Sequence, residues 1–582
     1  MHRVIPPEVL SAAPGAVVFW SGAGVSKDAP SNGPLGEELS RRVLACGFAD
    51  GLLDRMQRAY ARLEVNRSLP RLETLLDVAI AEHGLPLLPT LLADLVSMPP
   101  NPSHQFFAEH LRAGGFHATA NFDTCIEKAG GDELNLVHFH ERLRPGDDGG
   151  SLGARLSQIE RGFDPTLKQR LTDGLKTAAV VVVVGYRGLD FFDVDPYWRE
   201  LNDHRVLEGR VVLWVEHASF WKAIGRSQRS HHQLADFDRG GAVVYEIEAP
   251  TRQLLKILAT TWGFAPLTDP PPVPTSAPLL PSLTDVSRDH ANLRFFAYAG
   301  LDTEVQARLA GRPLSPEEHG WAAEAAWAAG RYREADDHWA KSRPGDSADD
   351  RAFRDERHAA VLWIRGELRR AYASLSVAFH DSRVHGADPE QRLVMAETLG
   401  RILVHMSRLP DTRWMATKTR REQALRRISD SEAELTRPLG VHLRIRIDSV
   451  RAALLRQPVD PERGDPVEGF QETEALMPML NYRYASLRAQ ATSTPTRLSP
   501  QKYWRQVQQF EVVGASGDAA RVPFLPGGET AFAPNDVWPR VKAVDFTRWH
   551  RARLFTYWLG LWAIEKVPPK HVIRRWTSRL GR

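Results

Sequence analysis

Cysteine is almost absent from this chain. Among its 582 residues only Cys46 and Cys125 occur, and two cysteines can build neither a disulfide framework nor a four-cysteine zinc site. Apolar runs as long as the ~20 residues that span a bilayer are also lacking, and the first residues have no apolar core of a signal peptide. We therefore expect a cytoplasmic protein without zinc and without a membrane segment.

An excess of charge of one sign is lacking as well. The chain has 75 Lys and Arg against 72 Asp and Glu, a net charge of +3, which does not by itself indicate nucleic-acid binding. The composition, 43% hydrophobic and 25% charged, is typical of a globular protein. A chain of this length exceeds one ordinary core, so we expect several domains.

A proline-rich segment separates two parts of different character. Residues 266–281 read PLTDPPPVPTSAPLLP, and proline at this density favours a stiff, extended linker over helix or central strand. We therefore predict a first domain over residues 1–265, a linker over 266–284 and a second domain over 285–582.

The first domain alternates apolar runs with helical patterns. The run Val180-Val181-Val182-Val183-Val184 is β-branched and uninterrupted, as in central strands of parallel sheets that are buried on both faces. Similar runs predict further strands. The predicted strands cover residues 17–20, 117–120, 134–139, 178–185, 211–215 and 242–247. We expect an α/β domain of Rossmann-like, doubly wound type with a mostly parallel sheet.

The second domain is rich in helix-forming residues and contains a modest repeat. Segments 321–335 and 360–371 each combine aromatic residues, a glycine turn and a following alanine; Gly330 and Gly366, like Ala335 and Ala371, lie 36 residues apart. This period is close to the ~34 residues of tetratricopeptide repeats. Helices over 391–409, 420–436 and 443–455 follow without a clean repeat. We expect an all-α, helical-repeat domain; a generic helical bundle stays open.

Candidate binding residues follow the predicted strands. In an open parallel sheet, ligands bind beyond the carboxyl ends of the strands, and glycine lets backbone approach a ligand closely. The residues in question are Gly22, Ala23, Gly24, Ser26, Asn121, Asp123, His140, Gly185 and Glu216. An ordinary βα turn also explains the first glycines, because the third glycine of G-x-G-x-x-G is absent.

These segments together resemble the sirtuin-like domain. The sequence reads GAGVS, TANFD, FHE and VVVVG in the family's order over about residues 8–265. Three features differ: the four-cysteine zinc ribbon is missing, DAPSNGPLGEEL replaces GIPDFR, and His140 is followed by Glu141 where the family has Gly. In the first two of these features the sequence resembles the bacterial sirtuin-like proteins of anti-phage defence.

This resemblance implies hydrolysis of NAD⁺ to nicotinamide and ADP-ribose by an abortive-infection effector. His140 would be the base, because an imidazole titrates near neutral pH. Asn121 would hold the water or a ribose hydroxyl, and Asp123 would orient the same network or balance charge around the cationic ring.

The remaining residues would hold NAD, as substrate. Gly22, Ala23 and Gly24 would give backbone N–H groups to the pyrophosphate, with Ser26 as a hydroxyl donor. Gly185 would let the adenine-side ribose approach, and Glu216 would bind ribose hydroxyls.

Several alternatives stay open. His138 lies two residues before His140, but His140 is nearer the strand end; His104 is more typical of a helix start than of a binding site. The domain could instead be a protein deacylase, or a sensor that binds NAD or ADP-ribose without turnover. For the helical domain we expect a protein trigger or partner and homo-oligomers; binding of nucleic acid is possible but less favoured.

Overall fold

The computed structural model forms two compact units. One comprises Met1–Gln57 and Arg67–Asn292, and the other Arg58–Asn66 and Leu293–Arg582. The structure describes residues 4–62, 67–147, 149–159, 162–188, 190, 193–228, 231–268, 283–299, 301–328, 331–408, 412–436, 439 and 441–455. Most of the predicted linker, and the predicted second domain beyond residue 455, lie outside these ranges.

The first unit is built on a seven-stranded sheet with the order β3-β2-β1-β4-β5-β7-β6. All neighbouring strands pair parallel except β6, which runs antiparallel to β7. The strands are β1 (Val17–Ser21), β2 (Phe116–Thr119), β3 (Leu136–His138), β4 (Val180–Val184), β5 (Val211–His217), β6 (Lys222–Ile224) and β7 (Val243–Ala249). The six predicted strands are confirmed within a few residues, and β6 was not predicted.

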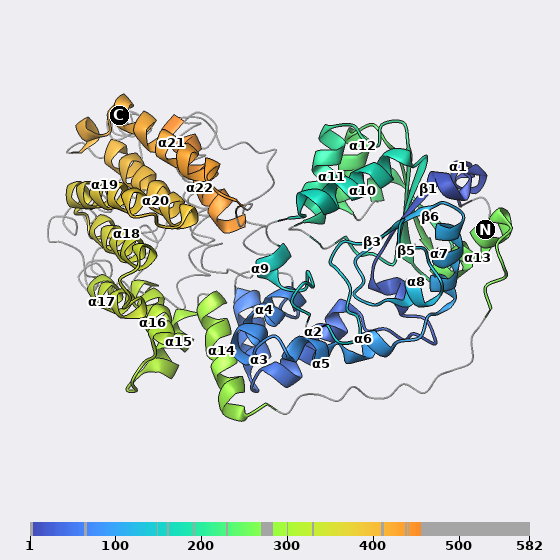
Figure 1. Cartoon of the computed structure of the whole chain (residues 1–582), viewed down its shortest axis with the longest axis horizontal. Helices are drawn as coiled ribbons and strands as arrows, with labels where there is room; N and C mark the ends of the chain where they lie inside the picture. The colour runs from blue at the N-terminus through green and yellow to red at the C-terminus, as the bar shows by residue number, and fades with distance from the viewer. Residues whose placement is uncertain are drawn as a thin grey trace, which may run out of the picture. The chain divides into compact units, whose positions relative to one another are not determined.

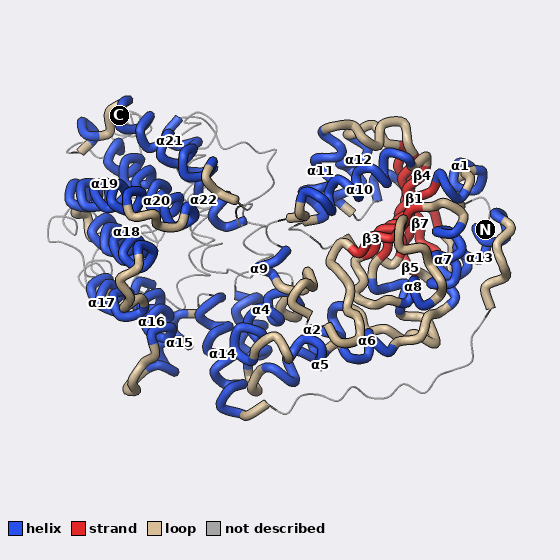
Figure 2. The backbone as a smooth tube through the Cα atoms, in the orientation of Figure 1, coloured by secondary structure: helices blue, strands red, loops and turns tan. Residues whose placement is uncertain are grey.

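Helices cover both faces of this sheet (Figures 1 and 2). Alternate β1 residues face opposite sides of the sheet. Val17 and Phe19 pack with residues of α1 (Pro7–Ser11), α7 (Pro102–Arg112) and α13 (Thr251–Trp262), whereas Val18 and Trp20 pack with residues of α10 (Pro165–Thr177), α11 (Val194–Asp203) and α12 (His232–Arg239). A strand that is buried on both faces needs apolar residues throughout, which is the pattern seen in β1 and β4.

The other elements of this part of the chain are short helices, several of them in the long connection between β1 and β2. They are α1 (Pro7–Ser11), η1 (Pro14–Ala16), η2 (Ala23–Ser26), α2 (Gly36–Gly47), α3 (Leu52–Arg62), α4 (Leu72–His83), α5 (Leu87–Leu91), α6 (Ala93–Ser97), α7 (Pro102–Arg112), α8 (Cys125–Lys128), α9 (Leu156–Ile159), α10 (Pro165–Thr177), α11 (Val194–Asp203), η3 (Arg226–Gln228), α12 (His232–Arg239) and α13 (Thr251–Trp262).

His110 of α7 is part of the apolar core of the first unit. Its side chain is 0% exposed, and its Nε2 donates to the carbonyl oxygens of Pro14 and Val17, each at 3.1 Å. Its ring meets Phe19 edge-on at a centroid distance of 4.8 Å. Burial lowers the pKa of His110 to about 4, against the smaller opposing effect of the two carbonyls. The imidazole is therefore neutral at physiological pH.

The regular elements of the second unit are all helices in the part that the structure describes. It includes the last residues of α3, and its other elements, of which α14 is also divided between the two units, are α14 (Asp285–Ala299), α15 (Asp302–Leu309), α16 (Pro316–Ala328), α17 (Tyr332–Ser342), α18 (Ala348–Ile364), α19 (Leu368–Val384), α20 (Pro389–Arg408), η4 (Arg413–Met415), α21 (Lys418–Ala433) and α22 (Val441–Leu455). Helices α16, α18 and α20 each pack against the next helix, so the unit is a series of helical hairpins.

The 36-residue spacing is visible in the packing of these hairpins. Ala335 in α17 and Ala371 in α19 are both 0% exposed. The same spacing relates Ala323 to Ala359 in the preceding helices, and these two alanines are also 0% exposed. Small residues at equivalent positions allow the two helices of each hairpin to approach closely. The tetratricopeptide assignment itself stays a prediction.

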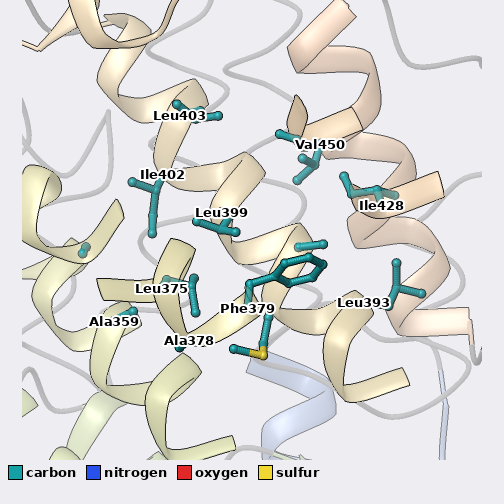
Figure 3. Close-up of a cluster of buried hydrophobic side chains, with 14 of the residues drawn as sticks. Ala359, Leu375, Ala378, Phe379, Leu393, Leu399, Ile402, Leu403, Ile428 and Val450 are labelled. Carbon is teal, nitrogen blue, oxygen red and sulfur yellow. The ribbon is translucent and has the colours of Figure 1, made fainter. Parts of the chain in front are cut away.

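The main core of this unit lies between α18, α19, α20, α21 and α22 (Figure 3). Leu399 and Ile402 of α20 point into it with Leu375 of α19, Ile428 of α21 and Val450 of α22. These leucine, isoleucine and valine side chains are 6% exposed or less. Burial of such side chains contributes roughly 1.5–3 kcal/mol each.

The division between the units falls inside α14, which the sequence analysis placed in the second domain. Residues before this division belong to the first unit, where Arg288 Nε donates to the carbonyl of Phe48 at 2.9 Å and Asn292 Nδ2 to that of Ala49 at 3.0 Å. The exact domain boundaries stay a prediction.

Among the residues that the structure places, no helix combines the length and the apolar character that crossing a membrane requires.

Candidate functional site

The loops after β1, β2 and β4 begin side by side. Ser21, the last residue of β1, is paired with Thr119 of β2 on one side and with Val184 of β4 on the other. The chain therefore leaves the sheet at this edge from three adjacent strands, and the strand order changes direction at β1 and β4. Crevices at such reversal points are where open α/β sheets bind ligands.

The predicted glycines pack against each other across this reversal. Gly24 N donates to the carbonyl of Gly185 at 2.9 Å, and Gly22 N donates to that of Val184 at 3.3 Å. A Cβ on Gly24 would lie 2.8 Å from Gly185 Cα, and Gly185 itself has a φ of +58°. Close contact between the two loops accounts for these glycines. Two of the amides assigned to the pyrophosphate are thus already hydrogen-bonded, and phosphate binding by Gly22, Ala23 and Gly24 stays a prediction.

Ser26 joins the loop after β1 to the loop after β2. Its Oγ accepts a hydrogen bond from Asn121 Nδ2 at 2.9 Å and donates one to Asp123 Oδ2 at 2.9 Å. The same Oγ lies 3.0 Å from His104 Nε2 of α7. All four side chains are buried. Three of the predicted site residues are therefore in direct contact, and the hydroxyl uses its proton and both lone pairs.

His104 stands on the opposite side of this serine in a defined tautomer. The backbone N–H of Asn101 donates to His104 Nδ1 at 3.0 Å, so the proton of the neutral ring is on Nε2 and is donated to Ser26. Burial lowers the pKa of His104, although Asp123 acts in the opposite direction. The ring is a hydrogen-bond donor to Ser26, whereas the sequence favoured a helix-start role for His104 over a place in the pocket.

His104, Asp123 and Cys125 are close enough to be considered as metal ligands. One donor atom from each lies within 4.8 Å of the others. However, the Nε2 of His104 carries a proton, and burial together with Asp123 raises the pKa of the Cys125 thiol. A metal would require loss of both protons, so this group fits a hydrogen-bond network better than a cation site.

One side-chain atom of Asn121 has no hydrogen-bond partner within the described part of the chain. Its Nδ2 is bound to Ser26, and its backbone N donates to Thr119 Oγ1 at 3.2 Å. Its Oδ1 is buried, in a residue that is 8% exposed, and accepts no hydrogen bond from the residues that the structure describes. Buried amide oxygens normally have a partner. The fixed amide therefore presents an acceptor to a ligand or water.

His140 is bound to Asp193, a residue that the sequence analysis did not select. His140 Nε2 lies 2.9 Å from Asp193 Oδ2, and the side chains are 8% and 2% exposed. Asp193 is the N-cap of α11, where its Oδ1 accepts from Val194 N at 2.7 Å. His140 Nδ1 makes no hydrogen bond to the residues that the structure describes.

The surroundings of His140 are acidic. Burial alone lowers the pKa of His140, but the charges of Asp193, Asp190 and Glu73 outweigh it and raise the pKa to about 9. Burial raises the pKa of Asp190 to about 6, opposed by His140. The imidazole therefore carries a positive charge at neutral pH in the free protein.

His138 is held at both nitrogens. Nδ1 donates to the carbonyl of Asn121 at 2.8 Å, and Nε2 lies 3.1 Å from Glu127 Oε1. With both nitrogens bound to the protein, His138 supports the loop of Asn121. His140 Nδ1 has no such partner among the described residues, and the choice of His140 over His138 as the base stays a prediction.

Glu141 occupies a backbone conformation typical of glycine. Its φ is +61°, in the left-handed region that is costly for residues with a Cβ. Glu141 is also the residue at which the sequence differs from the sirtuin-like pattern, and the resemblance itself stays a prediction. Glu141 also borders a polar hollow of about 520 Å³, whose other lining residues are Arg142, Arg144, Asp147, Gly150 and Ser151.

Glu216 belongs to a separate group. Its Oε1 accepts hydrogen bonds from Trp214 Nε1 at 3.1 Å and from His231 Nε2, and these bonds, that of His231 foremost, lower its pKa. His231 also stacks on Trp214 at 4.2 Å. Binding of ribose hydroxyls by Glu216 stays a prediction.

Asp193 was not among the residues predicted from the sequence, and His104 was ranked as a helix-start residue ahead of a pocket residue. Asp193 lies in the acidic stretch Asp190 to Asp195 after β4, and a carboxylate before a helix is the signal that could have found it.

No protein-family model matches this chain, and no curated protein matches it.

Proposed function

We propose that the first unit is a Rossmann-like, sirtuin-like NAD glycohydrolase that splits NAD⁺ into nicotinamide and ADP-ribose. One observation carries the proposal. Ser26 of the GAGVS segment and Asn121 of the TANFD segment, 95 residues apart, are hydrogen-bonded at 2.9 Å at the reversal point of the sheet, and Asn121 Oδ1 has no partner among the residues that the structure places. An amide fixed at one atom and free at the other can orient a water molecule or a ribose hydroxyl.

The reaction balances without a further reactant. The bond between ribose C1′ and the nicotinamide nitrogen breaks, and its electron pair stays on the ring nitrogen, whose positive charge is thereby neutralised. The oxygen of water forms the new bond to C1′, and one proton is released. The transition state resembles an oxocarbenium ion. The carboxylates of Asp190 and Asp193 supply negative charge near His140, which favours a developing cation.

His140 would take the proton of the attacking water. In the free protein its pKa is about 9, so the ring must first lose a proton. A cationic nicotinamide ring bound beside the same acids would lower this pKa, because like charges oppose each other. Substrate binding would thereby convert His140 into a neutral base.

The charged state of His140 also favours a second candidate function. An imidazolium cannot accept a proton. If the pKa of His140 stayed near 9 with ligand bound, the site would hold NAD or ADP-ribose without turnover. The unit would then be a nucleotide sensor, and the helical hairpins would carry the biological function.

The biological role we propose is that of an abortive-infection effector in anti-phage defence, acting in the cytoplasm. The helical hairpins offer an extended surface of the kind that binds protein segments. A protein trigger on this surface would release or assemble the enzyme, and we expect homo-oligomers.

The deciding experiment is NAD turnover by the purified full-length protein. Nicotinamide and ADP-ribose are measured by chromatography for the wild type and for Asn121→Ala and His140→Ala. We expect both substitutions to lower the rate more than ~10²-fold. Matched controls are Asn135→Ala and His204→Ala, whose side chains make no hydrogen bond within the described part of the first unit; both should keep the wild-type rate.

Three other results of this assay would each support a different conclusion. Turnover that survives in Asn121→Ala and His140→Ala would place the activity outside this site. NAD that binds in calorimetry without product would support the sensor. Product that appears only with an acetylated peptide would indicate a deacylase.

A further inference from the structure

The orientation of the His140 ring is set by one carboxylate. Asp193 Oδ2 faces His140 Nε2 at 2.9 Å, and Asp193 Oδ1 accepts from Val194 N at 2.7 Å. The carboxylate is therefore fixed at the start of α11, a helix of 10 residues, and each of its oxygens has a separate partner. Its side chain is 2% exposed, so it cannot turn toward solvent.

This arrangement distinguishes the two ring nitrogens. An ionised carboxylate accepts hydrogen bonds and cannot donate one. Nε2 therefore keeps its proton in both charge states of the imidazole, and Nδ1 is the atom that loses or gains a proton. Nδ1 is also the nitrogen for which the described residues provide no partner.

Other charged groups face the same ring. Asp190 lies in the loop that follows β4, and Glu73 lies in the first turn of α4. Glu73 Oε2 accepts from Arg71 Nε at 3.1 Å, so part of its charge is balanced locally. Asp193 is the acid in hydrogen-bond contact with His140 among those described, which makes it the one that can orient the ring.

We propose that Asp193 is the positioning residue of a His–Asp pair. It holds Nε2 of His140 toward α11 and leaves Nδ1 as the nitrogen that meets the substrate. The role of Nδ1 toward NAD rests on the function proposed above, but the orientation of the ring does not. Asp193 does not touch the reacting atoms; it acts through His140.

The test compares Asp193→Asn with Asp164→Asn in the full-length protein. Asp164 is also a helix N-cap, with its Oδ1 accepting from Thr166 N at 2.9 Å and Leu167 N at 3.1 Å, but no histidine that the structure describes is bonded to it. In Asp193→Asn the amide oxygen can still cap α11, and the amide nitrogen then faces Nε2 donor to donor. The neutral ring must move its proton to Nδ1, which blocks the reacting nitrogen.

The first readout is the titration of His140, followed by NMR with isotope-labelled histidine and assigned by the signal that His140→Gln removes. We expect the midpoint to fall by about 1–3 pH units in Asp193→Asn, with the neutral tautomer changing from Nε2–H to Nδ1–H. Asp164→Asn should leave both unchanged. An unchanged midpoint and tautomer in folded Asp193→Asn would overturn the proposal.

The second readout is the pH profile of NAD turnover. A base with a raised pKa makes kcat/KM rise with pH up to that pKa. In Asp193→Asn we expect kcat to fall ~10²- to 10⁴-fold and the profile to move to lower pH, with little change in KM. A wild-type kcat and profile in this variant would overturn the pairing while the hydrolase assignment stands.

Asp193→Ser is a second variant that separates loss of the carboxylate from a folding defect. Serine is also a good N-cap, so α11 keeps its cap while His140 loses its carboxylate, and the midpoint should fall as in Asp193→Asn. If His140 titrates as expected but the wild type does not hydrolyse NAD, the pairing stands and the proposed function fails.

Discussion

Gly24 donates its backbone N–H to the carbonyl of Gly185 at 2.9 Å, and the two residues leave no room for a side chain between the loops after β1 and β4. A Cβ on Gly24 would lie 2.8 Å from the Cα and 2.9 Å from the oxygen of Gly185. Because these are backbone atoms, relief of the overlap requires the loops to separate.

We predict that Gly24→Ala lowers the free energy of unfolding by about 1–3 kcal/mol, the usual cost of overpacking. Gly36→Ala is the matched control, because a Cβ there meets nothing within 4 Å and Gly36 begins α2, where alanine is favourable. Urea unfolding of both variants gives the measurement. Equal stability of the two variants would contradict the close packing of the loops.

Ser26→Ala should destabilise the protein more than an ordinary buried serine substitution. It leaves Asn121 Nδ2, Asp123 Oδ2 and His104 Nε2 without their common partner, and unsatisfied buried groups cost about 1–3 kcal/mol each. We expect a loss of about 2–4 kcal/mol in urea unfolding.

Ser40→Ala serves as the reference for Ser26→Ala. Ser40 is similarly buried, at 4% exposed, but its Oγ donates only to the carbonyl of Gly36 at 3.0 Å. A loss near 1 kcal/mol is expected there. If Ser26→Ala cost no more than this control, Ser26 would not be the common partner of the three side chains.

His110 should make the protein sensitive to acid. Its folded pKa of about 4 lies below the ordinary 6.5, so the unfolded chain takes up the proton first. The stability that neutral His110 contributes is complete above pH 6.5 and is lost as the pH falls toward 4. The full loss is about 3 kcal/mol.

His110→Gln separates this effect from that of other groups. Glutamine can donate to the same carbonyls and does not titrate, so we expect the wild type to lose stability relative to this variant between pH 6.5 and 4. Urea unfolding at several pH values measures the difference. Parallel curves for the two proteins would show that His110 does not titrate as expected.

Ala335 and Ala371 should respond alike to enlargement. Both are 0% exposed at equivalent positions of successive hairpins, and overpacking costs about 1–3 kcal/mol. We predict that Ala335→Leu and Ala371→Leu each lower the melting temperature, whereas Ala340→Leu on the exposed side of α17 does not. A lower melting temperature for only one of Ala335→Leu and Ala371→Leu would argue against the 36-residue repeat.

The strands could be predicted because burial on both faces of a parallel sheet demands a local apolar run, as in Val180–Val184. The same argument explains why β6 was missed. Lys222–Ile224 is three residues long, pairs antiparallel at the sheet edge and is mostly exposed, so neither burial nor alternation marks it in the sequence.

The site was predictable to the extent that it follows strand ends. Ser26, Asn121 and Asp123 meet because parallel strands deliver their next residues to one edge. Asp193 reaches His140 from the start of a helix 53 residues later, and His104 reaches Ser26 from α7. Contacts of this kind depend on how helices pack on the sheet, and no local spacing encodes them.

The position of β1 in the middle of the sheet has a consequence for synthesis of the protein. Val18 pairs with Phe116, and Val17 with Val180, so this apolar strand leaves the ribosome roughly 100 residues before its first neighbour. At about 5–20 residues per second, it waits on the order of 5–20 s unpaired. We expect the nascent chain to need shielding from aggregation during this interval, and Ser26, Asn121 and His140 to form a site only after Asp193 has emerged.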